Sequence, residues 1–288
     1  ASPKTMIQKM RSMMTTEFLA PAGSELALQS ALIAGADAVY FGVSQFSARA
    51  KADNFSIDQI GMVSDYCHAR GVKAYLAINT LIHDDEFDEA MDTVLKAYRE
   101  GIDAVIIQDK GLCALVSESF PDLQIHASTQ MNVHNKDSFH LAQQLGISRW
   151  VLPREFSRED IKASIKLSQE YSIGTEVFVH GAHCVSCSGI CLFSAMNKGG
   201  MRSGNRGDCA QPCRENYAIL GQSGKISEGA VFSIKDRSLY HFLGELVHMG
   251  VDSLKIEGRM RSPEYVRNVV SIYRRLLNQI LAETSVNA

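Results

Sequence analysis

The hydrophobic positions of this 288-residue chain form a loose repeat, in which a helical pattern is followed by a glycine and a short apolar run. Apolar residues three and four positions apart, such as Met91, Val94 and Tyr98, predict the helices. The glycine suits the left-handed conformation that ends many helices. The apolar run after it is typical of a parallel strand buried on both faces. Copies of this glycine-plus-strand unit are 35–42, 71–79, 101–108, 146–153 and 250–257.

Three further apolar runs, 18–20, 124–127 and 176–179, bring the number of predicted strands to eight. Eight strands that are nearly all separated by helical segments predict a (β/α)8 barrel of the TIM type, with an open doubly wound sheet as the alternative. The rhythm breaks after the seventh strand, where we predict a cysteine-rich insertion at about 181–235. Within it, a small hairpin is predicted to pair 217–220 with 231–234. We expect one barrel domain over 17–288, preceded by an N-terminal extension over 1–16.

Polar residues stand where the predicted strands end. In α/β barrels the loops after the strands form the active face, so these side chains predict a polar pocket. The insertion leaves the barrel at the same face, which should make its cysteines neighbours of the pocket. Taken singly, each of these residues also has an ordinary structural explanation. The residues are Asn79, Gln108, His126, Gln130, Arg154, His180, Glu257 and Arg259.

Seven cysteines are present, and five of them fall within thirty residues, from Cys184 to Cys213. Cys67 and Cys113 lie within apolar helical patterns and are predicted to be buried as small hydrophobic residues. Without a secretion signal, the crowding of the other five favours metal or redox chemistry over structural disulfides. Their irregular spacing suits an iron–sulfur cluster better than a compact zinc site, although zinc and reactive thiols remain alternatives. Cys187 is the surplus member, and we expect it to be a thiol near the cluster and not a ligand.

Composition narrows the function only slightly. Hydrophobic residues make up 45% of the chain, the net charge is −3, and no apolar run approaches the length of a membrane span. A globular cytoplasmic protein without a membrane span is therefore predicted. The charge weakens an RNA-binding interpretation without excluding it. A local basic group on the insertion would serve such binding, but a solvated loop would carry the same charges: Lys198, Arg202, Arg206 and Arg214.

Ordered motifs along nearly the whole chain resemble the collagenase-like peptidase family U thirty-two. They run from Leu19-Ala-Pro-Ala-Gly to Lys255-Ile-Glu-Gly-Arg and include His126-Ala-Ser-Thr-Gln and Cys209-Ala-Gln-Pro-Cys-Arg. The resemblance implies either proteolysis or oxygen-independent hydroxylation, of tRNA uridine, of a 23S rRNA cytidine or of the ubiquinone ring. The segment 79–85 most resembles the rRNA hydroxylation members, which are far longer than this chain.

The resemblance also implies cofactors and partners. A 4Fe-4S cluster is expected on Cys184, Cys191, Cys209 and Cys213, with prephenate as the source of the hydroxyl group. RNA, either tRNA or rRNA, is the expected partner, and a homo- or heterodimer is allowed, since the members of the quinone pathway work as a pair. Against a peptidase, the sequence lacks a Gly-x-Ser-x-Gly elbow and a His-Glu-x-x-His helix. A catalytic cysteine–histidine pair stays an alternative, since His180 and His183 lie just before Cys184.

Roles for the residues at the strand ends follow from the hydroxylation hypothesis. Arg154 and Arg259, with Arg214 as a further candidate, are expected to bind a dicarboxylate such as prephenate, unless they pair with nearby acidic residues. The candidates for proton transfer are His126, His180 and Glu257. The remaining predicted substrate-binding residues are Asn79, Gln108 and Gln130.

Overall fold

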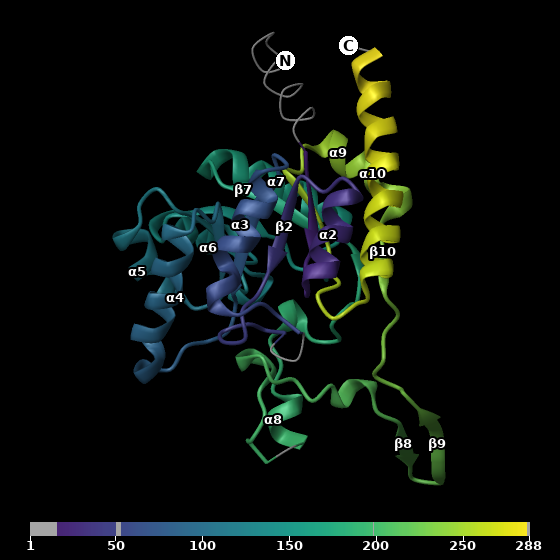
Figure 1. Cartoon of the computed structure of the whole chain (residues 1–288). Helices are drawn as coiled ribbons and strands as arrows, with labels where there is room; N and C mark the ends of the chain where they lie inside the picture. Colours follow the sequence, from purple (N-terminus) through teal and green to yellow (C-terminus); the bar gives the residue numbers. More distant parts are fainter. Residues whose placement is uncertain (1–15, 50–52, 198, 287–288) are drawn as a thin grey trace.

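Eight parallel strands form a closed barrel in the computed structural model, which describes residues 16–49, 53–197 and 199–286 (Figure 1). The ring closes because β7 pairs with both β6 and β11, while β11 pairs with β1. This closure confirms the predicted barrel and rules out the open sheet. Of the predicted extension, only Thr16 belongs to the described residues. The barrel strands are β1 (Glu17–Pro21), β2 (Ala38–Phe41), β3 (Lys73–Ile78), β4 (Ala104–Ile107), β5 (Gln124–Ala127), β6 (Ile147–Val151), β7 (Gly174–Gly181) and β11 (Ser253–Ile256).

Capping side chains mark the starts of several helices between the strands, and glycines follow the ends of others. Ser24, Asp109 and Ser157 each accept a hydrogen bond from a backbone N–H in the first turn of the helix that follows. The five glycines of the predicted repeat all have positive φ, between 68° and 91°, which confirms their expected role after helices. The helices are α2 (Glu25–Ile33), α3 (Ile60–His68), α4 (Phe87–Arg99), α5 (Lys110–Ser119), α6 (Lys136–Gln144), α7 (Arg158–Tyr171), α8 (Phe193–Asn197), α9 (Leu243–Met249) and α10 (Pro263–Val286).

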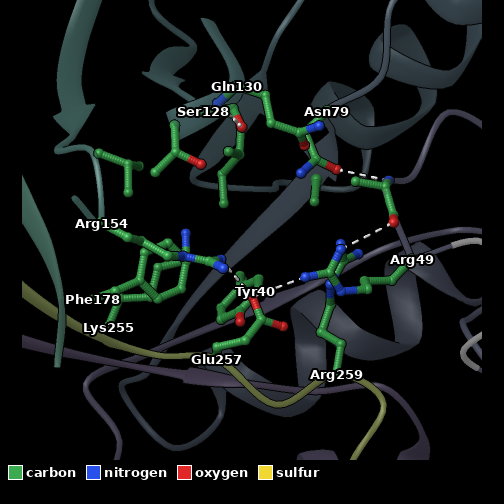
Figure 2. Close-up of a pocket in the computed structure, with 15 residues that line it drawn as sticks. Tyr40, Arg49, Asn79, Ser128, Gln130, Arg154, Phe178, Lys255, Glu257 and Arg259 are labelled. Atoms are coloured by element: carbon green, nitrogen blue, oxygen red, sulfur yellow. Dashed lines mark hydrogen bonds and ion pairs between the residues drawn. The ribbon is translucent and has the colours of Figure 1, made fainter. Parts of the chain in front are cut away.

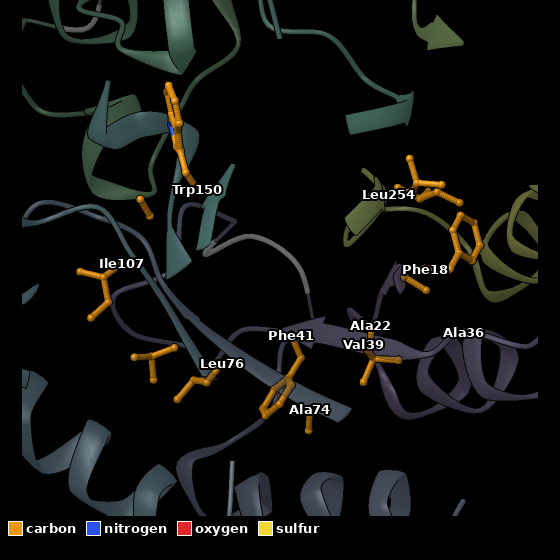
Figure 3. Packing of buried hydrophobic residues seen from close by; sticks show 14 of the residues in the cluster. Phe18, Ala22, Ala36, Val39, Phe41, Ala74, Leu76, Ile107, Trp150 and Leu254 are labelled. Atoms are coloured by element: carbon orange, nitrogen blue, oxygen red, sulfur yellow. The ribbon is translucent and has the colours of Figure 1, made fainter. Parts of the chain in front are cut away.

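The hydrophobic core has two parts. The larger lies between the outer face of the barrel and the helices, where side chains such as Phe18, Phe41 and Trp150 are buried (Figure 3). Cys67 and Cys113 belong to this layer, as predicted. A smaller cluster, which includes Leu19 of β1 and Ile106 of β4, is separate from the first. Its members come from the first four strands and occupy the barrel interior.

The barrel interior also holds charged side chains, which come from β1, β6, β7 and β11. Glu17 accepts hydrogen bonds from the Arg149 guanidinium and from the Tyr75 hydroxyl, the latter at 2.6 Å. Lys255 Nζ donates to Glu176 Oε1 at 2.8 Å, and Arg149 also lies 3.6 Å from Glu176. Burial alone would raise the pKa of Glu17, but the positive charge of Arg149 outweighs it and lowers that pKa. Four charged groups therefore neutralise one another inside the barrel.

The predicted insertion leaves the barrel after β7 and projects from the end opposite the C-terminal end of α10 (Figure 1). It contains α8 and the hairpin of β8 (Tyr217–Gly221) and β9 (Gly224–Gly229), and it returns through β10 (Arg237–Ser238), which pairs antiparallel with β7. The predicted second strand of the hairpin, 231–234, was wrong. Positive φ at Gly224 allows a tight turn, so the chain pairs sooner. Phe232 instead packs against the rings of Phe193 and Tyr217.

Candidate active site at the carboxyl ends of the strands

A polar pocket lies where the barrel strands end, as predicted, and cationic side chains dominate it (Figure 2). Arg49 comes from the loop after β2, Arg154 from the loop after β6 and Arg259 from the loop after β11. These three guanidiniums share the pocket with one carboxylate, Glu257. The fourth cation, Lys255, is already paired with Glu176. The pocket therefore carries an excess of positive charge and suits an anionic ligand.

Glu257 holds the arginines in place. Its Oε2 lies 2.9 Å from Arg154 Nη2 and 3.5 Å from Arg49 Nη2, and its side chain is only 10% exposed. Arg259 instead donates to Ser47 Oγ at 2.7 Å, and its buried Nε has no hydrogen-bond partner among the described residues. Burial would raise the pKa of Glu257, but the nearby guanidiniums, Arg49 first, lower it to about 2. Glu257 is therefore a carboxylate at neutral pH and positions the cations.

We expect the stability conferred by the Glu257 charge to fade only in acid. Because folding lowers this pKa from 4.5 to about 2, the contribution is fully present above pH 4.5 and is lost as the pH falls towards 2. The shift corresponds to about 3 kcal/mol. Urea unfolding of the wild type and Glu257→Gln should therefore show a constant difference in the free energy of unfolding above pH 5, which shrinks below it. A difference that stays the same from pH 7 to pH 3 would contradict the pairing.

The four cysteines Cys184, Cys191, Cys209 and Cys213 line a second cavity of about 100 Å³. Its wall shares Arg49, Thr129, Gln130 and Arg154 with the first pocket, so the two cavities adjoin. This confirms that the cysteines are neighbours of the polar pocket. All seven cysteines of the chain are free thiols.

The backbone supports the thiols individually. The N–H of Phe193 donates to Cys191 Sγ at 3.4 Å, and the N–H of Gln211 donates to Cys209 Sγ at 3.3 Å. Burial raises the pKa of the Cys213 thiol; Arg214 opposes this, while the other three cysteines of the cavity raise it further. The thiols are thus close enough to affect one another's ionisation.

Two further contacts fix the insertion against the barrel. Asn205 Oδ1 accepts the N–H of Cys191 at 3.1 Å, and the carbonyl of Asn205 accepts the N–H of Leu81 in the loop after β3. Gly207 has a φ of 82°, and a Cβ there would lie 2.3 Å from the carbonyl oxygen of Ser47. Only glycine permits this approach, which ties the cysteine loop to the loop that carries Arg49.

The structure brings together five of the predicted site residues and leaves three apart. Asn79, Gln130, Arg154, Glu257 and Arg259 line the pocket. His180 instead bonds through Nδ1 to the Tyr273 hydroxyl of α10, 3.2 Å away. His126 is 1% exposed, packs edge-on against Tyr75, and has no hydrogen-bond partner for either ring nitrogen among the described residues.

Gln108, the third residue that the structure leaves apart, is buried and does not line the pocket. Burial lowers the pKa of His126, as it does that of His180, so both rings favour the neutral form. Neither histidine is placed to exchange a proton with a molecule in the pocket. The predicted proton-transfer roles of these two histidines thus find no support in their positions.

Three residues that were not predicted also line the pocket: Arg49, Tyr40 and Lys255. Tyr40 and Lys255 had a detectable signal, since a polar group inside a buried strand needs a partner. The Tyr40 hydroxyl donates to the carbonyl of Ile256 at 2.9 Å, and its ring lies 4.4 Å from Lys255 Nζ. Arg49 stands in an irregular loop, and no periodic pattern identifies it.

The basic side chains predicted to meet a polynucleotide are engaged within the protein. Arg202 pairs with Asp208 and Arg206 with Glu86, at 2.7 and 2.6 Å. Arg214 donates to a hydroxyl and a carbonyl oxygen in the segment between β9 and β10, and to a carbonyl oxygen shortly after β7. Lys198 lies outside the described residues. These charges therefore stabilise the insertion, and we assign them no ligand.

The sequence model of Peptidase family U32 matches residues 23–288. The chain belongs to this family. Among solved structures, the U32 peptidase Mk0906 resembles it with a TM-score of 0.56 at 14% sequence identity, over 84% of this chain and 92% of that one. This likeness supports the barrel fold alone.

Curated relatives of this U32 chain carry different functional names. It is 37% identical to the 23S rRNA 5-hydroxycytidine C2501 synthase of Escherichia coli, over 93% of this chain and 40% of that protein. It is 34% identical to the tRNA hydroxylation protein P1 of Bacillus subtilis, over 93% and 64%. It is 32% identical to a Collagenase of Porphyromonas gingivalis, over 91% and 65%.

The U32 chain thus spans between two fifths and about two thirds of the length of these relatives. Their alignments cover nearly all of it, so the barrel and the cysteine insertion lie within the shared region. Among the described residues, no helix combines the length and the apolar character that crossing a bilayer requires.

Proposed function

We propose that this U32 barrel carries an iron–sulfur cluster and hydroxylates a pyrimidine base of RNA, tRNA uridine or 23S rRNA cytidine, in the cytoplasm. The observation that carries the proposal is the meeting of four free thiols around one cavity that adjoins a cationic pocket. Relatives named for hydroxylation of rRNA and tRNA support the choice of reaction. Association into a homo- or heterodimer stays a prediction.

The four thiols of the cavity fit a 4Fe-4S cluster in number and chemistry. Cys184, Cys191, Cys209 and Cys213 would hold it, since thiolates are the usual ligands of such clusters. The two backbone N–H groups that donate to Cys191 and Cys209 are the kind of hydrogen bond that tunes cluster potentials. When bound, the cluster would supply one-electron redox chemistry. Gly204 lines the cavity, where an added Cβ would lie 3.7 Å from the Cβ of Cys209, so glycine leaves room beside the thiols.

The cationic pocket would bind the co-substrate that donates the hydroxyl group, for which prephenate is our candidate. Prephenate is a dicarboxylate, and guanidiniums bind carboxylates in a directed, often bidentate manner. Arg49 and Arg154 line both cavities, so they would hold one carboxylate at the boundary with the cysteines. Arg259, with its unpartnered Nε, would meet the other. Gln130, also at the boundary, offers amide donors and an acceptor to the base.

Replacing Arg49 by methionine should weaken the binding of prephenate by about 10- to 100-fold, the equivalent of losing one hydrogen bond to a charged group. Arg49 is the best test because its ion pair with Glu257 is the longer of the two, so its loss disturbs the fold least. Isothermal titration calorimetry measures the change. Arg70→Met serves as the control, since Arg70 lies over the Tyr66 ring on α3, away from the pocket. Equal affinities in the Arg49 variant and the control would exclude this assignment.

Nucleoside mass spectrometry tests the function itself. Total tRNA and rRNA from a strain that lacks the gene should be missing one hydroxylated pyrimidine nucleoside. Expression of the wild-type protein should restore it. If every modified nucleoside is unchanged in the deletion strain, the chain has another substrate and the proposal fails.

A further inference from the structure

Three side chains with different metal-binding groups meet beside the cysteine cavity: His134, Glu155 and Cys187. They come from separate segments, the loop that follows β5, the loop after β6 and the turn that carries the surplus cysteine. One imidazole nitrogen, one carboxylate oxygen and the thiol sulfur all lie within 4.8 Å of one another. Glu155 also lines the cysteine cavity, whereas His134 and Cys187 do not. The group is therefore a separate feature of the cavity rim.

The distances in this group suit a transition-metal ion. Bonds of about 2.0–2.3 Å in a tetrahedral site place the ligand atoms about 3.3–3.8 Å apart. His134 Nε2 and Glu155 Oε1 are 3.4 Å apart, and Cys187 Sγ lies 2.9 Å from the same oxygen. Small rotations of the thiol and the imidazole would therefore complete the geometry. In the structure the Cys187 thiol donates a hydrogen bond to the Glu155 carboxylate. In the metal site both groups would bind the same ion.

We propose that His134, Glu155 and Cys187 bind a divalent transition-metal ion of the Zn²⁺ or Fe²⁺ class, distinct from any cluster on the other four cysteines. Imidazole, carboxylate and thiolate are all established ligands of these ions. Three protein ligands leave a fourth position for water or a substrate atom, the arrangement of catalytic rather than structural zinc sites. The side chains of His134 and Glu155 are 31% and 33% exposed, so solvent can reach that position.

A serine-based catalytic group at this place fits the geometry less well. Ser188 Oγ lies 2.7 Å from His134 Nε2 and 2.9 Å from Glu155 Oε1, which superficially resembles a Ser-His-acid triad. In a triad the acid contacts the imidazole nitrogen that faces away from the serine. Here the serine and the carboxylate approach the same nitrogen, and Ser188 is buried. Ser188 instead supports Glu155, which accepts its N–H at 2.8 Å.

Cobalt binding tests this site in the intact protein, whatever the state of the four-cysteine cavity. Anaerobically purified wild type, His134→Ala, Glu155→Gln and Cys187→Ser would be equilibrated with Co²⁺ and desalted, and cobalt and iron would be counted by mass spectrometry. The matched control is His140→Ala, whose imidazole lies on the exposed side of α6 and contacts Gln144. We expect the wild type and the control to retain one Co²⁺ per chain more than each of the three variants, with equal iron in all five proteins.

Two results would overturn the proposal. Equal cobalt in the wild type and the three variants would show that the group is only a hydrogen-bonded network. If Cys187→Ser loses iron while His134→Ala keeps the iron content of the wild type, Cys187 belongs to the cluster instead. The near-ultraviolet absorption of thiolate-bound cobalt adds a second measurement, and we expect it to fall in Cys187→Ser.

Discussion

Replacing Cys209 by serine should abolish hydroxylation of the RNA nucleoside in cells. A serine hydroxyl is a hard, rarely ionised ligand, so the cluster would lose one of its four attachments. Loss of a residue that merely supports a metal ligand typically costs 10- to 100-fold in activity, and we expect the loss of a ligand to exceed about 100-fold. Mass spectrometry of nucleosides from the deletion strain that carries the variant measures the effect.

Two controls make this result specific. Cys67→Ala removes a thiol from the outer core layer, away from the cavity, and should leave hydroxylation intact. The Collagenase relative suggests the second control, digestion of gelatin by Cys209→Ala combined with Cys213→Ala. A proteolytic activity that persists in this double variant would remove the main support for hydroxylation.

Arg149→Met should destabilise the fold by about 3–5 kcal/mol, the cost of breaking a buried ion pair. Arg149 is the shared partner of Glu17 and Glu176, which are 8% and 0% exposed, so its removal leaves buried negative charge uncompensated. Urea unfolding followed by circular dichroism measures the free energy.

The matched control for this change is Arg158→Met, in which the same replacement breaks a surface ion pair with Glu245. Arg158 is 65% exposed, so we expect a change of at most about 1 kcal/mol. Equal destabilisation of the two variants would show that burial does not govern the contribution of these pairs.

The barrel was predictable because its signals are local. Apolar runs of strand length and glycines such as Gly35 and Gly250 recur at each unit, and the structure confirms both the strands and the positive φ of the glycines. The closeness of the cysteines to the pocket followed from the order of the elements alone. The hairpin of the insertion was only partly predicted. The apolar residues around Phe232 suggested a strand, but Phe232 is apolar because it packs against Tyr217, which is distant in the sequence.

The orientation of individual site residues was less predictable. In β7 the pairing with β11 shifts so that Lys255 lies opposite Phe178 and Ile256 opposite His180. Such an irregularity reverses which face the next side chain occupies, and His180 turns towards α10. Arg49 reaches the pocket because Asn79 Oδ1 accepts the N–H of Ala48 at 3.0 Å. That long-range bond leaves no pattern in the sequence.

The most direct test of the central claim is an iron and sulfide assay, with a visible absorption spectrum, on protein purified without oxygen. We expect about four iron and four sulfide ions per chain and the broad charge-transfer absorption of a cysteinate-bound cluster. Conversion of Cys184, Cys191, Cys209 and Cys213 to serine should remove the sulfide, the absorption band and the four iron ions of the cluster. Wild-type protein that contains zinc in place of iron, or that holds no iron after anaerobic purification, would contradict the claim.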